Sequence, residues 1–184
     1  LWMIRERSVA ERALAPQLTH VRNYYGAMTI SDSLFVTSVS SDTTLHGIQI
    51  KGENSREPTS YYTRGSGLGL VLTELQKDPA ALRLGVIGLG AGTVAAYVRP
   101  QDKIVFWEIN PLATQIAQER FTFLKECPGA NEVRMIDGRL GVRNDPGAFD
   151  VLVVDAFSGD SIPAHLLTTE AIREYLAKLK TGGF

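Results

Sequence analysis

The sequence predicts an α/β protein in which a small antiparallel β-meander precedes a parallel sheet. Three observations support this fold class. Runs rich in Val, Ile, Thr, Tyr and Phe, separated by short polar pairs, fill the region between residues 18 and 60. From residue 82 onward, short apolar strands alternate with helical segments, which is typical of a parallel sheet with right-handed crossovers. A glycine-rich turn, residues 88–92, joins the first of these strands to the next helix.

The first part of the chain divides into an N-terminal helix or linker (1–17), a β-meander domain (18–60) and a connecting helix (61–77). A helical pattern runs over residues 1–18 and stops near Pro16. The strands of the meander are expected at residues 21–30, 34–40 and 44–50, followed by a polar loop over 51–60.

The second part, residues 78–184, is expected to form one domain of alternating strands and helices. Its strands are predicted at residues 84–87, 103–108, 132–136 and 150–155. Helices are predicted to start at 92–98 and to span 111–124, with Pro111 in the first turn, and 161–180. The apolar strands suit a sheet that is buried on both faces.

The composition gives no sign of a nucleic-acid-binding protein or of a metal-binding protein. The formal net charge is −1, which gives no general attraction to nucleic acid, and we expect no nucleic-acid partner. One cysteine and three widely spaced histidines offer no metal-ligand cluster, so no metal site is predicted.

The two ends of the sequence are unusual. Apolar residues 1–4 run directly into Arg5 and Arg7, which is read either as the start of an amphipathic helix or as the cytoplasmic end of a membrane segment upstream of residue 1. The expected location is the cytoplasm, either as a free protein or as the soluble domain of a membrane protein. Residues 178–184 read as a helix end, a glycine cap and the first residue of a new strand.

The first candidate ligand-binding feature is the turn that contains Gly88, Gly90 and Gly92. Glycines after a buried strand let the backbone turn tightly and let a ligand approach the helix N-terminus. Glu108 ends the following strand, where a carboxylate accepts hydrogen bonds from ribose hydroxyls. Thr93 stands where a full dinucleotide fingerprint has its third glycine, so a nicotinamide-dependent oxidoreductase is a distant alternative.

Two aspartates follow the next two strands, and we expect both to point into the same crevice. Asp137 precedes Gly138, so its carboxylate is placed to accept from the exocyclic amine of an adenine while the glycine leaves room for the ring. Helix capping is the alternative role for Asp137. Asp155 is expected nearest the reacting end of the ligand, where it holds or deprotonates an amine.

The order of these motifs resembles the spermidine synthase (polyamine aminopropyltransferase) family, a branch of the Rossmann-like class I methyltransferase fold. The resemblance rests on residues 86–92, 107–110, 136–138, 148–155 and 163–168, and on the upstream segments 45–49 and 61–62. It extends over roughly residues 20–184 and is closest to bacterial proteins in which such a domain follows a membrane segment.

The resemblance implies a role for individual residues. Glu108 would bind the ribose, Asp137 with Gly138 the adenine, and Asp155 the attacking amine as the catalytic residue. Gln49 and Tyr61 would line the cofactor and amine pocket, and Tyr62 and Asp160 would contact the acceptor. The cofactor would be S-adenosylmethionine or its decarboxylated form, the second partner a small-molecule amine, and the reaction a displacement at the carbon next to the sulfonium.

Ala91 stands where the family has an aspartate that pairs with the amine of the decarboxylated donor. Three hypotheses therefore stay open: an aminopropyltransferase-like enzyme, a methyltransferase that uses S-adenosylmethionine, and a non-catalytic nucleoside-binding regulatory domain. A class I methyltransferase sheet also has further strands after the one at 150–155. We therefore expect a C-terminally incomplete sheet, whose apolar edge is covered by further strands or by a second copy of the chain.

Overall fold

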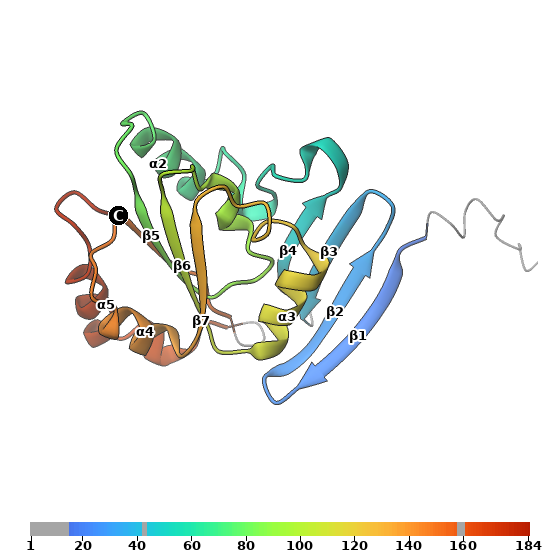
Figure 1. Cartoon of the computed structure of the whole chain (residues 1–184). Helices are drawn as coiled ribbons and strands as arrows, with labels where there is room; N and C mark the ends of the chain where they lie inside the picture. The colour runs from blue at the N-terminus through green and yellow to red at the C-terminus, as the bar shows by residue number, and fades with distance from the viewer. Residues whose placement is uncertain (1–14, 42–43, 158–160) are drawn as a thin grey trace, which may run out of the picture.

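The computed structural model describes residues 15–41, 44–157 and 161–184. These residues form two four-stranded sheets, one antiparallel and one parallel, with helices on both faces of the parallel sheet (Figure 1). The predicted α/β fold, with an antiparallel sheet before a parallel one, is thus confirmed. The helix expected over residues 1–18 lies largely outside the described residues.

The antiparallel sheet has four strands in the order β1-β2-β3-β4, and not the three that were expected. Its strands are β1 (Gln17–Asn23), β2 (Gly26–Asp32), β3 (Val36–Ser41) and β4 (Thr44–Ile50). The single strand predicted at 21–30 is wrong, because a hairpin turn at Tyr24 and Tyr25 divides it. Asn23 accepts a hydrogen bond from the Tyr25 N–H, and Gly26 takes a φ of 129°. The high strand propensity of tyrosine hides this turn in the sequence.

The connecting segment contains the short 3₁₀ helices η1 (Gly52–Asn54) and η2 (Ser60–Tyr62), followed by α2 (Gly67–Leu75). The helix expected over 61–77 is therefore shorter. Ser66 caps α2 by accepting from the Gly69 N–H at 3.1 Å. Tyr61 and Tyr62 lie in η2 instead of on α2, and this turn directs their hydroxyls toward Asp155.

The parallel sheet has the order β7-β6-β5-β8. Its strands are β5 (Arg83–Ile87), β6 (Lys103–Glu108), β7 (Ala130–Met135) and β8 (Val151–Val154). The chain builds outward from β5 in one direction through β6 and β7, then returns to place β8 on the other side. The strand order thus reverses between β5 and β8, which is the point where open α/β sheets bind ligands.

The segments between these strands are η3 (Thr93–Tyr97), α3 (Pro111–Arg120) and α4 (Gly138–Asn144), with η4 (Ala164–Leu166) and α5 (Thr169–Leu176) after β8. Two helices are shorter than predicted. The helix expected to reach 124 ends at Arg120, where Phe121 becomes extended and buried. The helix expected over 161–180 is divided, because Thr168 starts α5 by accepting from the Ala171 N–H.

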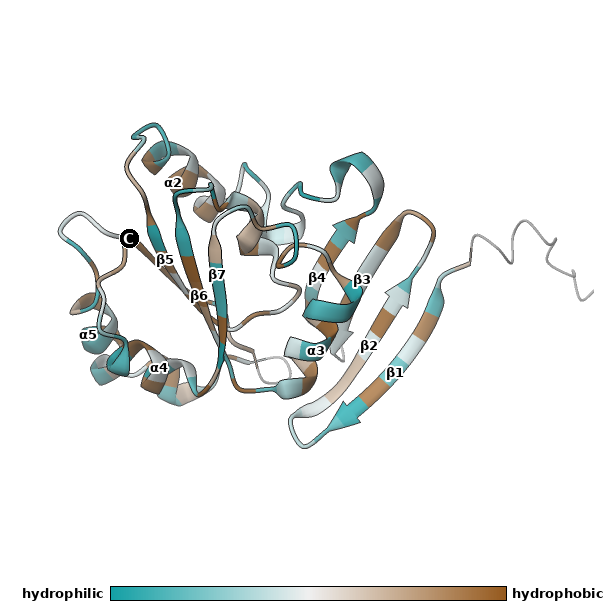
Figure 2. Ribbon diagram, in the orientation of Figure 1, coloured by the Kyte–Doolittle hydropathy of each residue, from teal (hydrophilic) through white to brown (hydrophobic). Residues whose placement is uncertain are grey.

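Alternate side chains of β5 and β6 enter two different hydrophobic clusters. Leu84, Val86 and Phe106 pack with α2, α3 and the small sheet, which share one cluster. Ile87 and Trp107 pack with α4 and α5 on the other face. Figure 2 shows hydrophobic residues along both central strands after their charged first residues. The small sheet is therefore packed onto the parallel sheet through a continuous core.

The outer side of β8 pairs with residues near the end of the sequence. Phe149 and Leu179 form a parallel bridge, and the Leu152 N–H donates to the Phe184 carbonyl at 2.8 Å. Phe184 itself is not part of a strand, so the prediction that it begins one stays a prediction. We also expected further strands or a second copy of the chain to cover the rest of this edge, and this stays a prediction. Within the described ranges, no helix combines the length and the apolar character needed to cross a membrane.

Candidate functional site

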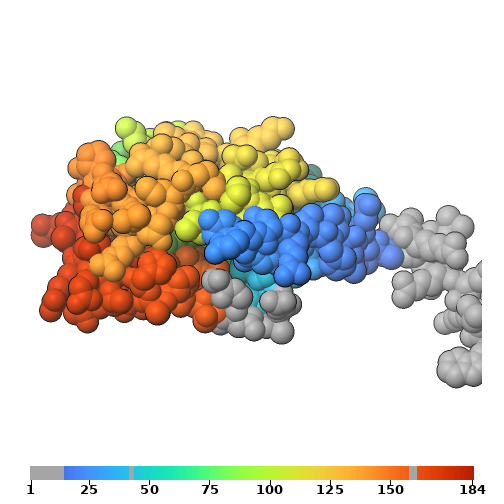
Figure 3. Space-filling model, turned by 90° about the horizontal axis from the view of Figure 1, so that it is seen from below, coloured from blue at the N-terminus to red at the C-terminus, as the bar shows by residue number. Residues whose placement is uncertain are grey.

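A cavity of about 560 Å³ lies between the carboxyl ends of the parallel strands and the small antiparallel sheet. All four strands of the parallel sheet contribute residues at or just after their last position. Seen from below, blue residues of the small sheet lie against yellow residues of the α3 region, with orange and red residues of the last third opposite (Figure 3). The cavity is thus assembled from segments distant in the sequence.

The glycine turn forms one wall of this cavity. Gly88 has a φ of 95°, and a Cβ on it would lie 2.1 Å from the Asp155 carbonyl oxygen. A Cβ on Gly90, with a φ of 55°, would lie 2.5 Å from the His46 carbonyl oxygen. Only glycine fits both the backbone conformation and the space at these two positions. The turn is therefore held closely between β8 and β4.

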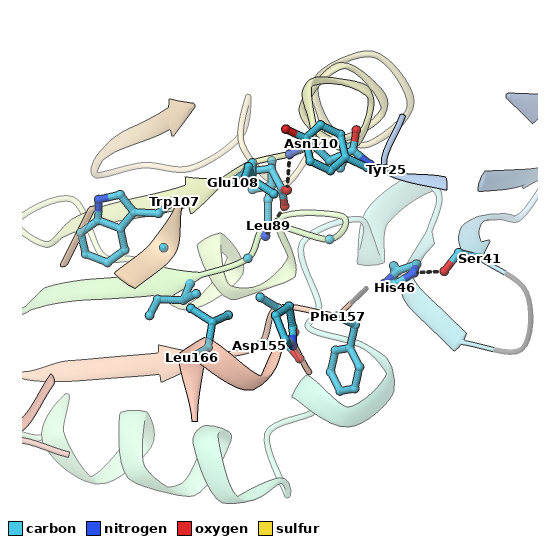
Figure 4. A pocket seen from close by; sticks show the side chains of 18 of the residues that line it. Tyr25, Ser41, His46, Leu89, Trp107, Glu108, Asn110, Asp155, Phe157 and Leu166 are labelled. Carbon is cyan, nitrogen blue, oxygen red and sulfur yellow. Dashed lines mark hydrogen bonds between the residues drawn. The ribbon is translucent and has the colours of Figure 1, made fainter. Parts of the chain in front are cut away.

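Glu108 is the buried carboxylate of the site, with an exposed fraction of 9%. It accepts hydrogen bonds from the Leu89 N–H at 3.0 Å and from the Asn110 N–H at 2.7 Å (Figure 4). Burial raises the pKa of Glu108, and these backbone donors oppose that rise by stabilising the ionised form. Each oxygen keeps a further lone pair, so the carboxylate can still accept from two hydroxyls of a ligand.

Asp155 lies across the cavity from Glu108, just after β8. One of its oxygens, Oδ2, accepts from the hydroxyl of Tyr62 and, at 3.4 Å, from that of Tyr61. Burial raises the pKa of Asp155, whereas these two hydrogen bonds lower it, with a net rise. Among the described residues, both hydrogen bonds to the Asp155 carboxylate go to Oδ2, and none goes to Oδ1. This is the arrangement of a carboxylate that can accept a proton.

Asp137 and Gly138 line the cavity at the start of α4. Asp137 is the N-cap of this helix and accepts from the Leu140 N–H at 3.0 Å, while its Oδ2 lies 2.8 Å from His165 Nε2. Burial alone would raise the pKa of Asp137, but the Leu140 and His165 contacts bring it below its usual value. Capping and exposure to the cavity thus occur together in this residue.

The structure separates the predicted site residues into two groups. Tyr61, Gly88, Gly90, Glu108, Asp137, Gly138 and Asp155 all line the cavity. Gln49 does not: it is buried, donates to the Ser55 carbonyl and to Thr122, and accepts from the Thr122 N–H. Gly92 packs on Leu124 outside the lining, and Tyr62 reaches the site only through Asp155. Asp160 lies outside the described residues.

Ala91 faces the small sheet and not the cavity. It is 1% exposed, and a Cβ built on Gly47 of β4 would lie only 2.3 Å from the Ala91 Cβ. A larger side chain at position 91 has no room unless β4 moves. The described residues thus place no carboxylate within the glycine turn.

Several residues of the cavity were not singled out from the sequence. His46 lies beside the glycine turn with its Nε2 2.5 Å from Ser41 Oγ, and burial lowers its pKa (Figure 4). His165 also lines the cavity, with its side chain 53% exposed. Neither histidine stands at a fixed spacing from the strand ends, so only the fold brings them in. Asn110 was detectable, because an Asn before Pro111 is a typical helix cap.

Relatives among curated proteins share parts of this sequence. A polyamine aminopropyltransferase of Vibrio vulnificus is 32% identical over 123 residues, which is 62% of this chain and 40% of that protein. A probable polyamine aminopropyl transferase of Bifidobacterium longum is 30% identical over 101 residues, or 53% of this chain and 22% of that protein. The chain thus spans less than half the length of either relative. No family model matches the sequence.

Solved structures share the fold, two of them over more of the chain than the sequence relatives. Spermidine synthase from Thermotoga maritima matches 89% of this chain and 54% of its own, with a TM-score of 0.65 and 19% identity. A spermidine synthase in complex with the transition-state analogue AdoDATO has a TM-score of 0.60 at 16% identity, again over 89% of this chain and 53% of its own. Human methyltransferase-like protein 13 in complex with SAH has a TM-score of 0.51 at 23% identity, over 62% of this chain and 58% of its own.

The predicted resemblance is thus found in two independent comparisons. The sequence relatives are named aminopropyltransferases, and the structural neighbours that match 89% of this chain are spermidine synthases. This chain is thus similar in sequence to polyamine aminopropyltransferases and shares its fold with spermidine synthases and with a class I methyltransferase type of sheet.

Proposed function

We propose that this chain carries the donor site of a transferase that uses an adenosyl sulfonium compound and a small-molecule amine, in the manner of an aminopropyltransferase. The observation that carries the proposal is the placement of Glu108, Asp137 and Asp155 around one cavity at the strand-order reversal. The names of the sequence relatives support the same reaction class.

The lining residues fit an adenosyl group. Glu108 is fixed by two backbone donors and keeps acceptor capacity for a diol such as ribose. Gly88 and Gly90 bring bare backbone to the cavity wall, which allows close approach of a ligand. Asp137 provides an acceptor for a base, beside Gly138, which has no side chain to obstruct the ring. These residues would hold S-adenosylmethionine or its decarboxylated form.

When bound, the sulfonium would supply an electrophilic carbon with a neutral thioether as the leaving group. Asp155 is the residue that would serve the nucleophile: its Oδ1 would accept a hydrogen bond from the amine and orient the nitrogen lone pair. As the new C–N bond forms and the C–S bond breaks, the amine nitrogen gains a positive charge. Asp155 would stabilise that charge and take the released proton.

Methyl transfer from intact S-adenosylmethionine is the second candidate, and Ala91 is the observation that favours it. A donor with a lone ammonium tail needs a carboxylate partner, and position 91 is filled by packing against Gly47. The intact donor has its own carboxylate beside the ammonium, so its tail is compensated internally.

Titration calorimetry with intact and decarboxylated S-adenosylmethionine tests the proposal. We expect Glu108→Ala to weaken binding of either donor by about 10- to 100-fold, because hydrogen bonds from the ribose to a buried carboxylate are lost. Glu119→Ala is the matched control, since Glu119 is exposed on α3, accepts a hydrogen bond from Gln115 and does not line the cavity.

The relative affinities separate the candidates. Tighter binding of the decarboxylated donor supports aminopropyl transfer, and tighter binding of the intact donor supports methyl transfer. Binding of both donors without turnover of any amine in the full-length protein would favour a regulatory nucleoside-binding domain. An unchanged affinity in Glu108→Ala would contradict the donor site itself.

A further inference from the structure

The polar edge of the cavity at Asp137 is built from two segments that are distant in the sequence. His165 of η4 places its Nε2 2.8 Å from Asp137 Oδ2. Arg139, from α4, donates to the His165 carbonyl at 3.3 Å and also binds Glu174 on α5. His165 is therefore held by its backbone as well as by its ring, although its side chain is 53% exposed.

The chemistry of this pair fixes what it can offer a ligand. A ring nitrogen that faces a carboxylate carries a proton, so Nε2 of His165 donates to Asp137. In the neutral imidazole, Nδ1 is then an acceptor. The contacts from His165 and Leu140 also lower the pKa of Asp137, which keeps its carboxylate ionised and without a proton to donate. The edge therefore presents acceptors and no donor from Asp137.

The surroundings of this edge suit a planar ring. Gly138 lies under Ile87, where a Cβ would come within 2.2 Å of the Ile87 Cγ2. Leu166, which is 3% exposed, lines the same part of the cavity next to His165. A flat heterocycle placed between these apolar groups would turn one polar edge toward Asp137.

We propose that His165 is a specificity-determining, positioning residue: it holds Asp137 as a fixed acceptor that selects a 6-aminopurine over a 6-oxopurine. This inference rests on the proposed function, because it requires the donor's base to lie at Asp137. A 6-amino group donates to the carboxylate, whereas a 6-oxo group turns its own lone pairs toward it. Without His165, the Leu140 N–H still holds Oδ1 of Asp137, but Oδ2 loses its partner and is no longer fixed as an unprotonated acceptor.

Calorimetric titration with adenosine and with inosine tests this selection without any turnover. The wild-type chain should bind adenosine about tenfold more tightly than inosine, which corresponds to one hydrogen bond gained and one repulsion avoided. His165→Ala should lower this ratio at least about threefold, and His165→Gln, which can still donate to Asp137, should restore most of it. His20→Ala is the matched control, because His20 lies on β1 and contacts Thr29 away from the cavity.

A second variant keeps the test decisive if His165→Ala fails to fold. Asp137→Asn preserves a good helix cap but gives the edge an amide donor, so its ratio should fall to about one or below. An unchanged ratio in folded His165→Ala, or in Asp137→Asn, would overturn the inference, and continued binding of adenosine would leave the donor site standing. Failure of the wild-type chain to bind adenosine at all would overturn both.

Discussion

At the scale of single residues, the carboxylate of Asp155 combines burial with two hydrogen bonds from tyrosines. Burial raises the pKa of Asp155 in the folded chain, so folding favours its protonated form. Below its ordinary unfolded pKa of about 3.9, Asp155 is protonated in both states and does not lower the free energy of unfolding. Stability is lost as the pH rises through the pKa of Asp155 in the folded chain. Above that value the penalty of an ionised, buried group is complete.

Asp155→Asn should for this reason stabilise the chain at about pH 7, with a rise in Tm of roughly 2 to 4 °C. The amide oxygen can still accept from Tyr61 and Tyr62, and the charge is gone. The advantage should shrink toward about pH 3, where the wild-type carboxyl is protonated in both states. Scanning calorimetry at the two pH values measures it, with Asp78→Asn as an exposed control. Equal or lower stability of Asp155→Asn at neutral pH would contradict this view.

Ala91 lies within the glycine turn and is buried against the small sheet. Its side chain packs on Gly47 and leaves no space for a carboxylate. Ala91→Asp should therefore destabilise the chain by about 3 kcal/mol or more, through overpacking and an unpaired buried charge. Urea unfolding measures the loss, with Ala80→Asp at an exposed position for comparison. A stable Ala91→Asp protein that binds decarboxylated S-adenosylmethionine more tightly would show that this position faces the donor after all.

At the scale of elements, α4 packs very closely against β6. A Cβ on Gly141 would lie 2.1 Å from Cδ1 of Trp107, whose ring is buried and stacks edge-on against Phe149. This contact lets α4 approach the sheet and brings Asp137, at the start of the helix, to the cavity. The packing of α4 therefore positions the edge at Asp137, where we propose that the base binds.

Gly141→Ala should lower the free energy of unfolding by about 1 to 3 kcal/mol, because the new methyl group overpacks the indole. Gly67→Ala is the control: it lies at the start of α2 with open space around it, and should be neutral or slightly stabilising. Urea unfolding of both variants measures the difference. A loss in Gly141→Ala no larger than in Gly67→Ala would show that α4 can move without cost.

The elements also show where sequence reasoning stops. The parallel strands were predictable, because continuous apolar runs between turn signals identify buried strands. The hairpin at Tyr24 and Tyr25 was not, since two strong strand formers occupy the turn and only Asn23 and Gly26 mark it. The helix ends were misjudged wherever a cap was overlooked, as at Ser66 and Thr168.

At the scale of the whole molecule, the site depends on how the small sheet packs over the parallel one. Asn23 of β1 donates to the Asn110 side chain at 2.7 Å, and Gln49 of β4 binds both the N–H and the hydroxyl of Thr122. These contacts join the small sheet to the segment that begins at Glu108. The sheet thereby closes one side of the cavity.

The residues of the candidate site divide into those that the predicted strands place and those that only tertiary packing brings in. Glu108, Asp137 and Asp155 follow predicted strands, and the parallel topology alone places them together. His46 and His165 come from a different sheet and a short 3₁₀ segment, and their approach to the strand ends depends on tertiary packing that no local pattern encodes.

The central claim, that this cavity binds an adenosyl group, is tested most directly by a crystal structure with methylthioadenosine, the nucleoside that aminopropyl transfer would release. We predict that the ribose hydroxyls lie within hydrogen-bonding distance of Glu108 and that the base lies against Gly138 with its amino group toward Asp137. A nucleoside bound outside this cavity, or bound within it with its ribose away from Glu108, would contradict the claim.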